Sequence, residues 1–152
     1  MIVKACLFRF KHLLIIPLTL LTLGIGVVNL AIAQSKLYNP IALPPTNEVV
    51  DKLTENDIPT GIGGFARDYL VKLNKGDNVA IDLTSDSFDA MVVLLSAEGT
   101  TISENDDGPD GTTNALLFTR VTKTGTYVVR VRAFGETGVG SFKLKVTRLR
   151  PA

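Results

Sequence analysis

The sequence predicts an all-β protein, built as an antiparallel β-sandwich of about seven to eight strands. Apolar and polar residues alternate with a period of two over most of residues 66–147. Turns that contain glycine interrupt this alternation at short intervals, and the segments between them are rich in β-branched residues. No stretch after residue 33 keeps a helical period over a useful length. Short alternating strands separated by such turns are typical of antiparallel sandwiches.

Most of the expected strands follow from this alternation. In the first, Tyr69, Val71 and Leu73 alternate with polar residues, and the sequence Asn-Lys-Gly-Asp at 74–77 predicts a turn. The run at 90–95 is continuously apolar, as in a strand that is buried on both faces. The remaining strands are expected over 79–83, 100–103, 115–121, 127–131 and 142–146, with a glycine-rich loop over 134–140.

One set of alternating residues in each strand should face the space between the two sheets. A core of this kind suits a single domain of ordinary size. The predicted core residues are Tyr69, Val71, Leu73, Val79, Ile81, Leu83, Val92, Leu94, Leu116, Phe118, Tyr127, Val129, Val131, Phe142, Leu144 and Val146.

The first 33 residues have the pattern of a cleavable signal peptide. A short basic region precedes an uncharged apolar run from Leu13 to Leu30, and Ala31-Ile32-Ala33 is a cleavage signal, so cleavage is expected after Ala33. Because the apolar run is near the length of a membrane span, an uncleaved anchor is the alternative. The protein is therefore predicted to be exported, either to the periplasm or to the extracellular space.

Residues 34–64 are predicted to form a linker, which precedes a β-sandwich domain over 65–150. Four prolines and three glycines fall within this segment, and both residue types break regular structure at such density. Between them, Glu48 to Asn56 is expected to form one short helical turn. The sequence at 61–64 neither follows a strand nor opens a helix, so it is expected to be a hinge rather than a dinucleotide-binding loop.

The composition of the exported part excludes several kinds of catalysis. The only cysteine and the only histidine, Cys6 and His12, lie in the signal segment. Cleavage would leave no Cys or His nucleophile, no Ser-His-Asp arrangement and no ordinary zinc site. It would also remove three of the 16 basic residues and none of the 15 acidic ones, leaving a nearly neutral domain. We therefore expect neither an enzyme nor a nucleic-acid-binding protein.

Oxygen-bearing side chains are concentrated between the strands expected at 100–103 and 115–121. Calcium takes six to eight oxygen ligands, and several could come from Asp89, Asn105, Asp106, Asp107 and Asp110 if residue 89 lies beside this segment. The spacing does not match an EF-hand loop, because Pro109 falls where a ligand should be. Alternatively, these are turn residues, since Asn, Asp and Gly favour turns for local backbone reasons. Calcium is the one candidate cofactor.

A second candidate surface is basic. Arg130, Arg132, Lys143 and Lys145 fall on the polar sides of two strands that are expected to be adjacent, where they could form a positive stripe for an anionic polymer. Few aromatic residues interleave with them, so a stacking platform for bases or sugars is not predicted. The alternative is a solvated outer face, or a sheet edge protected by charge.

The order of short motifs over 65–149 resembles the bacterial pre-peptidase C-terminal domain (PPC) family. The motifs are the turn at 74–77, the strand at 89–94, the turn at 98–99, the Asn-Asp-Asp loop at 105–107, and the ending segments at 125–131 and 141–146. The resemblance implies a jelly-roll-like β-sandwich that serves secreted peptidases as an accessory module in secretion, localisation or substrate binding. In clostridial collagenases a similar domain binds calcium and collagen. Since only a signal and a linker precede the domain, the peptidase role is not carried over.

These observations predict a non-catalytic, exported binding module of the cell envelope or the extracellular space, which assists secretion or localisation. Its expected partner is an envelope or extracellular protein or polysaccharide. Contact with a membrane is expected only through the signal segment, if that segment is kept. The alternative function is that of a calcium-stabilised structural protein of the envelope or matrix.

Overall fold

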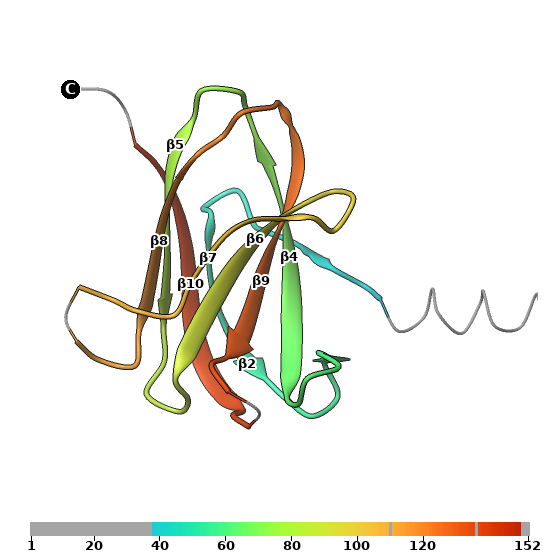
Figure 1. The fold of residues 1–152 in the computed structure, drawn as a ribbon, viewed down its shortest axis with the longest axis vertical. Coiled ribbons are helices and arrows are strands. Elements are labelled where there is room, and N and C mark those ends of the chain that lie inside the picture. The colour runs from blue at the N-terminus through green and yellow to red at the C-terminus, as the bar shows by residue number, and fades with distance from the viewer. Residues whose placement is uncertain (1–37, 110, 136, 150–152) are drawn as a thin grey trace, which may run out of the picture.

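The computed structural model describes residues 38–109, 111–135 and 137–149, which form two β-sheets packed face to face (Figure 1). One sheet has six strands in the order β1-β4-β9-β6-β7, with β3 also paired to β4, and the other has four in the order β2-β10-β5-β8. The strands are β1 (Ile41–Ala42), β2 (Glu48–Leu53), β3 (Ile58–Pro59), β4 (Phe65–Leu73), β5 (Asn78–Thr84), β6 (Ala90–Ser96), β7 (Thr101–Asn105), β8 (Ala115–Arg120), β9 (Gly125–Ala133) and β10 (Gly140–Leu149).

The predicted all-β, antiparallel architecture is confirmed. The strand pairings are antiparallel apart from a short parallel pairing of β1 with β4. The signal segment predicted over 1–33 lies outside the described residues. Within the described part of the chain, no helix is long and apolar enough to cross a membrane.

The segment predicted as a linker contributes three strands to the sandwich, and the helical turn expected within Glu48–Asn56 is wrong. Instead β2 pairs with β10 along its whole length, from Gly140 opposite Leu53 to Lys145 opposite Glu48. Leu53 is fully buried in the core. The apolar residues of β2 fit either a strand or a single helical turn, and only the pairing with β10 distinguishes the two. The sandwich therefore begins well before the boundary predicted at residue 65.

The core between the sheets contains nearly all of the residues predicted for it, but β8 faces the other way. The sequence at 115–118 is Ala-Leu-Leu-Phe, so both of its faces are apolar and the alternation there is ambiguous. Pairing of Ile81 with Leu117 turns Leu117 inward, and the prediction that Leu116 and Phe118 are buried is wrong. Phe118 is 61% exposed on the outer face of the four-stranded sheet.

The strand β6 is buried on both faces, as the continuous apolar run predicts. One set of its residues, which includes Val92 and Leu94, packs into the core between the sheets. The alternate set, Met91, Val93 and Leu95, forms a second small cluster with Val128 on the outer face of the six-stranded sheet. The apolar residues on the outer face of this sheet are therefore buried. On the outer face of the other sheet, Val50 and Phe118 are exposed.

Candidate functional site

Four connections leave the strands at the same end of the sandwich, which we call the loop end. They are residues 54–64, 85–89, 106–114 and 134–139. Strand pairing places them together, because Ala66 lies opposite Arg132 and Ala90 opposite Ala133 in one sheet, and Thr84 lies opposite Lys143 in the other. In Figure 1 these connections occupy the lower part of the molecule. Loops that a rigid sandwich holds together in this way are common binding sites.

Every charged residue in these four connections is acidic. Such residues suit turns, because Asp can form hydrogen bonds with its own backbone nearby. The topology then brings the separate acidic turns to one surface. The sequence of any single turn does not predict this grouping. The charged residues are Glu55, Asp57, Asp86, Asp89, Asp106, Asp107, Asp110 and Glu136, of which Asp110 and Glu136 lie outside the described residues.

Hydrogen bonds between the connections hold the loop end in shape. The Oγ1 of Thr113 donates to the carbonyl oxygen of Ser85 at 3.0 Å, and the N–H of Ala90 donates to the carbonyl oxygen of Thr113 at 2.8 Å. The Oγ of Ser85 donates to the carbonyl oxygen of Ser141 at 2.9 Å. At Gly140, which has φ of 142°, an added Cβ would collide with the side chain of Ser87. These contacts hold the connections 85–89 and 106–114 to each other and to the start of β10 before any partner binds.

Asn105, predicted as an oxygen ligand, is the last residue of β7 and closes the acidic loop. Its Nδ2 donates to the carbonyl oxygens of Asp107 at 2.7 Å and of Leu116 at 2.8 Å. The N–H of Leu116 also donates to the carbonyl oxygen of Asp107 at 3.0 Å. The amide group of Asn105 thus ties the beginning of the loop to its end, and Oδ1 is the side-chain atom left for a cation.

The other predicted calcium ligands are only partly placed. Asp89 immediately precedes β6 and is exposed, Asp106 is half-buried and Asp107 is exposed, all at the loop end. Asp110 lies outside the described residues. Across the described ranges, no group of three or more Asp, Glu, His or Cys side chains is arranged to hold a metal ion. The calcium site, which includes Asp110, stays a prediction.

Exposed apolar residues accompany the acidic ones, and the sequence pattern did not predict their exposure. Phe134 is 52% exposed and Ile62 is 67% exposed, and Val139 is also exposed. Phe134 follows β9 and Ile62 precedes β4, which are paired neighbours, so both residues lie at the same end of the same sheet. The sequence could have indicated this exposure, because both are large apolar residues next to glycines, in segments where the alternation stops.

A shallow pocket of about 290 Å³ opens beside the loop end, on the side of the four-stranded sheet. Its lining is mainly polar and includes Asp86, Ser87, Asn114, Ser141 and Lys143. Lys143 is already paired with Glu48, at 2.7 Å between Nζ and Oε1. The pocket therefore extends the polar surface of the loop end.

The predicted basic stripe does not exist, because β9 and β10 lie in different sheets. Arg130 and Arg132 project from the outer face of the six-stranded sheet, and Lys143 and Lys145 project from the outer face of the other. Arg130 is moreover committed to the buried Asp68, through Nε to Oδ1 at 2.8 Å and Nη2 to Oδ2 at 2.9 Å. This hydrogen bonding raises the pKa of Arg130 above its ordinary value. Consecutive strands need not pair, and sequence alone does not assign them to sheets.

Comparisons with known proteins agree with this fold. Residues 66–133 match the model of the bacterial pre-peptidase C-terminal domain. A solved structure of the pre-peptidase C-terminal domain of collagenase from Bacillus anthracis is similar, with a TM-score of 0.52 and 13% identity over 72% of this chain and 93% of that one. A comparison with curated protein sequences finds no match.

A second similar structure is PliG from Aeromonas hydrophila, a periplasmic lysozyme inhibitor of g-type lysozyme. It is 13% identical, with a TM-score of 0.49, over 71% of this chain and 96% of that one. The family match covers the central strands from β4 to β9, and the similar collagenase domain has the same overall fold. Over residues 66–133 the chain therefore matches the bacterial pre-peptidase C-terminal domain family, as the order of its short motifs predicts.

Proposed function

We propose that this protein is an exported, non-catalytic binding module of the cell envelope or the extracellular space, and that the loop end is its binding surface. The observation that carries the proposal is that Phe134 and Ile62 are exposed in connections that also contain acidic residues. Exposed apolar side chains surrounded by polar ones mark interaction sites. Aromatic residues are frequent among those that dominate binding energy.

The absence of catalysis is supported by the residue types in the domain. Residues 38–149 contain no cysteine and no histidine, so the usual nucleophiles and bases that depend on them cannot form there. Export is supported by the pattern of the first 33 residues and by the family match, whose name places such domains with peptidases. Assistance in secretion or localisation is part of this proposal.

A calcium-stabilised structural protein of the envelope or matrix is the second candidate. It is favoured by the carboxylates of Asp86, Asp89, Asp106 and Asp107, which make no ion pair with any described residue. Without a cation, like charges at one end repel one another and raise the energy of the folded state.

The proposed binding surface can be tested with the purified exported protein immobilised and exposed to envelope extract. Phe134→Ser should remove the captured partner, whereas Phe118→Ser should not. Phe118 is a matched control because it is similarly exposed but lies on the outer face of the four-stranded sheet. Equal capture by the wild type and by Phe134→Ser would show that the loop end is not the surface used.

A further inference from the structure

We infer that the partner of the loop end is a basic protein surface with an apolar pocket that receives Phe134. This inference rests on the proposed function, since it names the partner of the same surface. It follows from three properties of the loop end: charged residues that are all acidic in its connections, an exposed aromatic residue in one of them, and hydrogen bonds that hold three of the connections together.

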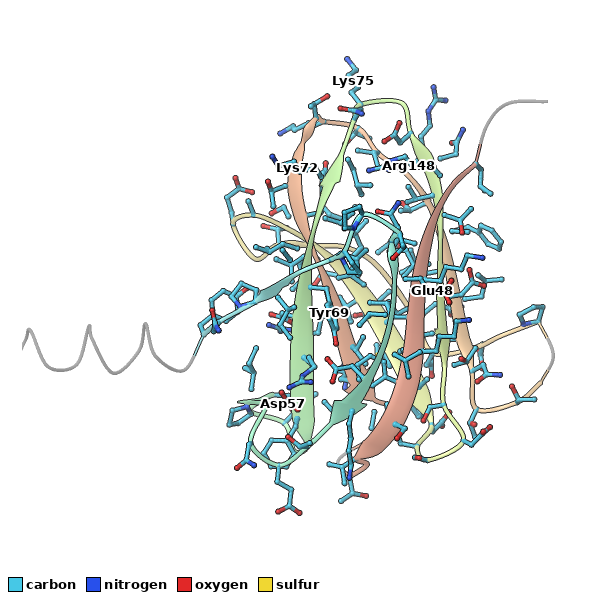
Figure 2. The ribbon with its side chains drawn as sticks, turned by 180° about the vertical axis from the view of Figure 1, so that it is seen from behind. Glu48, Asp57, Tyr69, Lys72, Lys75 and Arg148 are labelled. Carbon is cyan, nitrogen blue, oxygen red and sulfur yellow. The ribbon has the colours of Figure 1, made fainter. Side chains whose placement is uncertain are left out.

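The acidity of the loop end is a local property of the fold. Without the three basic residues of the signal segment the chain has 13 basic and 15 acidic residues and is nearly neutral, so the acidic connections must be balanced by cations elsewhere. Figure 2 labels Asp57 at the loop end and Lys72, Lys75 and Arg148 toward the opposite end. Charges of one sign gathered on one face add to a potential that attracts a partner of the other sign and speeds its association.

Most of the carboxylates at the loop end remain available to a partner. Asp57 is committed, because its Oδ1 lies 2.9 Å from Nε of Arg67 and its Oδ2 accepts from Thr54. Asp86, Asp89 and Asp107 are exposed and form no ion pair with the described residues. The cations Lys52 and Arg132, each two residues before a connection, are too few to reverse the sign.

Phe134 is placed beside Asp89 by a backbone contact. Its N–H donates to the carbonyl oxygen of Asp89 at 2.7 Å, so the aromatic residue and the acidic residue are held side by side. An aromatic ring next to carboxylates suits a lysine or arginine side chain, which can lie over the ring while it pairs with an oxygen. Ile62 and Val139 add apolar surface for the stems of such side chains.

Other occupants fit the loop end less well. A second copy could offer its opposite end, but there Arg148 is already paired with Asp77 at 3.4 Å, so only part of the positive charge is left for a contact. A polysaccharide would need a platform of exposed rings. The ring pairs of the described chain, Tyr69 with Phe142 and Phe88 with Phe142, are buried in the core. A basic protein surface matches both the charge and the apolar residues.

The test uses the exported protein and two fluorescent probe peptides, one of alternating lysine and leucine and one of alternating glutamate and leucine. Fluorescence anisotropy at about 150 mM salt, where exposed charges are partly screened, should detect binding of the lysine peptide only. The double variant Asp86→Asn/Asp89→Asn should weaken binding by at least about tenfold. The matched control Asp82→Asn/Glu104→Gln, which removes the same charge from the strands β5 and β7, should change it less than about twofold.

Phe134→Ser should weaken binding of the lysine peptide even at about 500 mM salt, because its apolar contact is not screened. The inference is overturned if the lysine peptide does not bind at about 150 mM salt, or if both double variants weaken it equally. It is also overturned if light scattering finds a dimer that the loop-end variants abolish, since a second copy would then be the occupant. Failure with the peptide but loss of captured partner in Phe134→Ser would refute only the basic partner. If Phe134→Ser changed neither the capture from envelope extract nor the binding of the lysine peptide, the binding surface would be refuted as well.

Discussion

The hydroxyl group of Tyr69 on β4 donates a 2.7 Å hydrogen bond to Oδ2 of Asp51 on β2. These strands belong to opposite sheets, and Tyr69 is completely buried, so the bond joins the two layers through the core. Nη1 of Arg67 lies 2.6 Å from the other oxygen of Asp51. The segment that precedes the family match is therefore an integral part of the sandwich, held to it by polar contacts as well as by β2.

Asp51→Ala should destabilise the domain by about 1–3 kcal/mol, because it leaves the buried hydroxyl of Tyr69 without an acceptor. Urea denaturation at neutral pH measures the change in the free energy of unfolding. Lys52→Ala is the matched control, since Lys52 is adjacent on β2 but exposed, and it should change stability by less than about 0.5 kcal/mol. Similar effects from the two substitutions would argue against a stabilising role for the contacts of Asp51 with Tyr69 and Arg67.

Stability should fall steeply above about pH 10, the ordinary pKa of tyrosine. Burial, and then the hydrogen bond to Asp51, raise the pKa of Tyr69 in the folded state. The unfolded state therefore loses this proton first as the pH rises, and the contribution that is present below the unfolded pKa is progressively lost. Tyr69→Phe should show a shallower fall between pH 9 and 11 in denaturation experiments, relative to its own stability at about pH 7. Parallel curves for the two proteins would contradict this cause.

Leu94→Ala should reduce the free energy of unfolding by about 2–5 kcal/mol, because Leu94 is completely buried between the sheets. Phe118→Ala should cost far less, although it removes a larger side chain, since Phe118 is mostly exposed. Thermal and urea unfolding of both variants would check the orientation of β8. A larger loss at Phe118 than at Leu94 would mean that the strand faces inward as the sequence first indicated.

Calcium, if it binds Asp89, Asn105, Asp106, Asp107 and Asp110, should raise the melting temperature by several degrees. An ion that binds only the folded state at about 100 times its dissociation constant stabilises it by about 2.7 kcal/mol. Asp107→Asn should remove most of the rise, and magnesium should produce less of it because it requires stricter geometry. Identical melting in millimolar calcium and in chelator would leave these residues as turn formers.

The exported protein should begin at or near Gln34, which mass spectrometry of the purified protein can establish. The basic start, the apolar run and the cleavage signal all lead to this expectation. Recovery of intact protein from Met1 onward in the membrane fraction would instead support an uncleaved anchor.

Much of the fold could be predicted because its signals are local. Residues 69, 71 and 73 alternate with polar neighbours, and β4 contains them as expected. The same rule gave β5, β9 and β10 and most of the core. For β8 the rule failed, because apolar residues occupy both faces of Ala115–Phe118 and no local feature selects one of them. For β2 it failed because six residues between prolines fit two kinds of structure.

The sequence by itself determined that the chain is all-β, where most strands lie, and that acidic residues gather in its turns. Only the tertiary structure decided that four acidic connections share one end, that Phe134 and Ile62 are exposed beside them, and that Arg130 and Lys143 lie on opposite faces. The physical reason is that alternation depends on neighbouring residues, whereas sheet assignment and register depend on hydrogen bonds and packing between residues far apart in the chain.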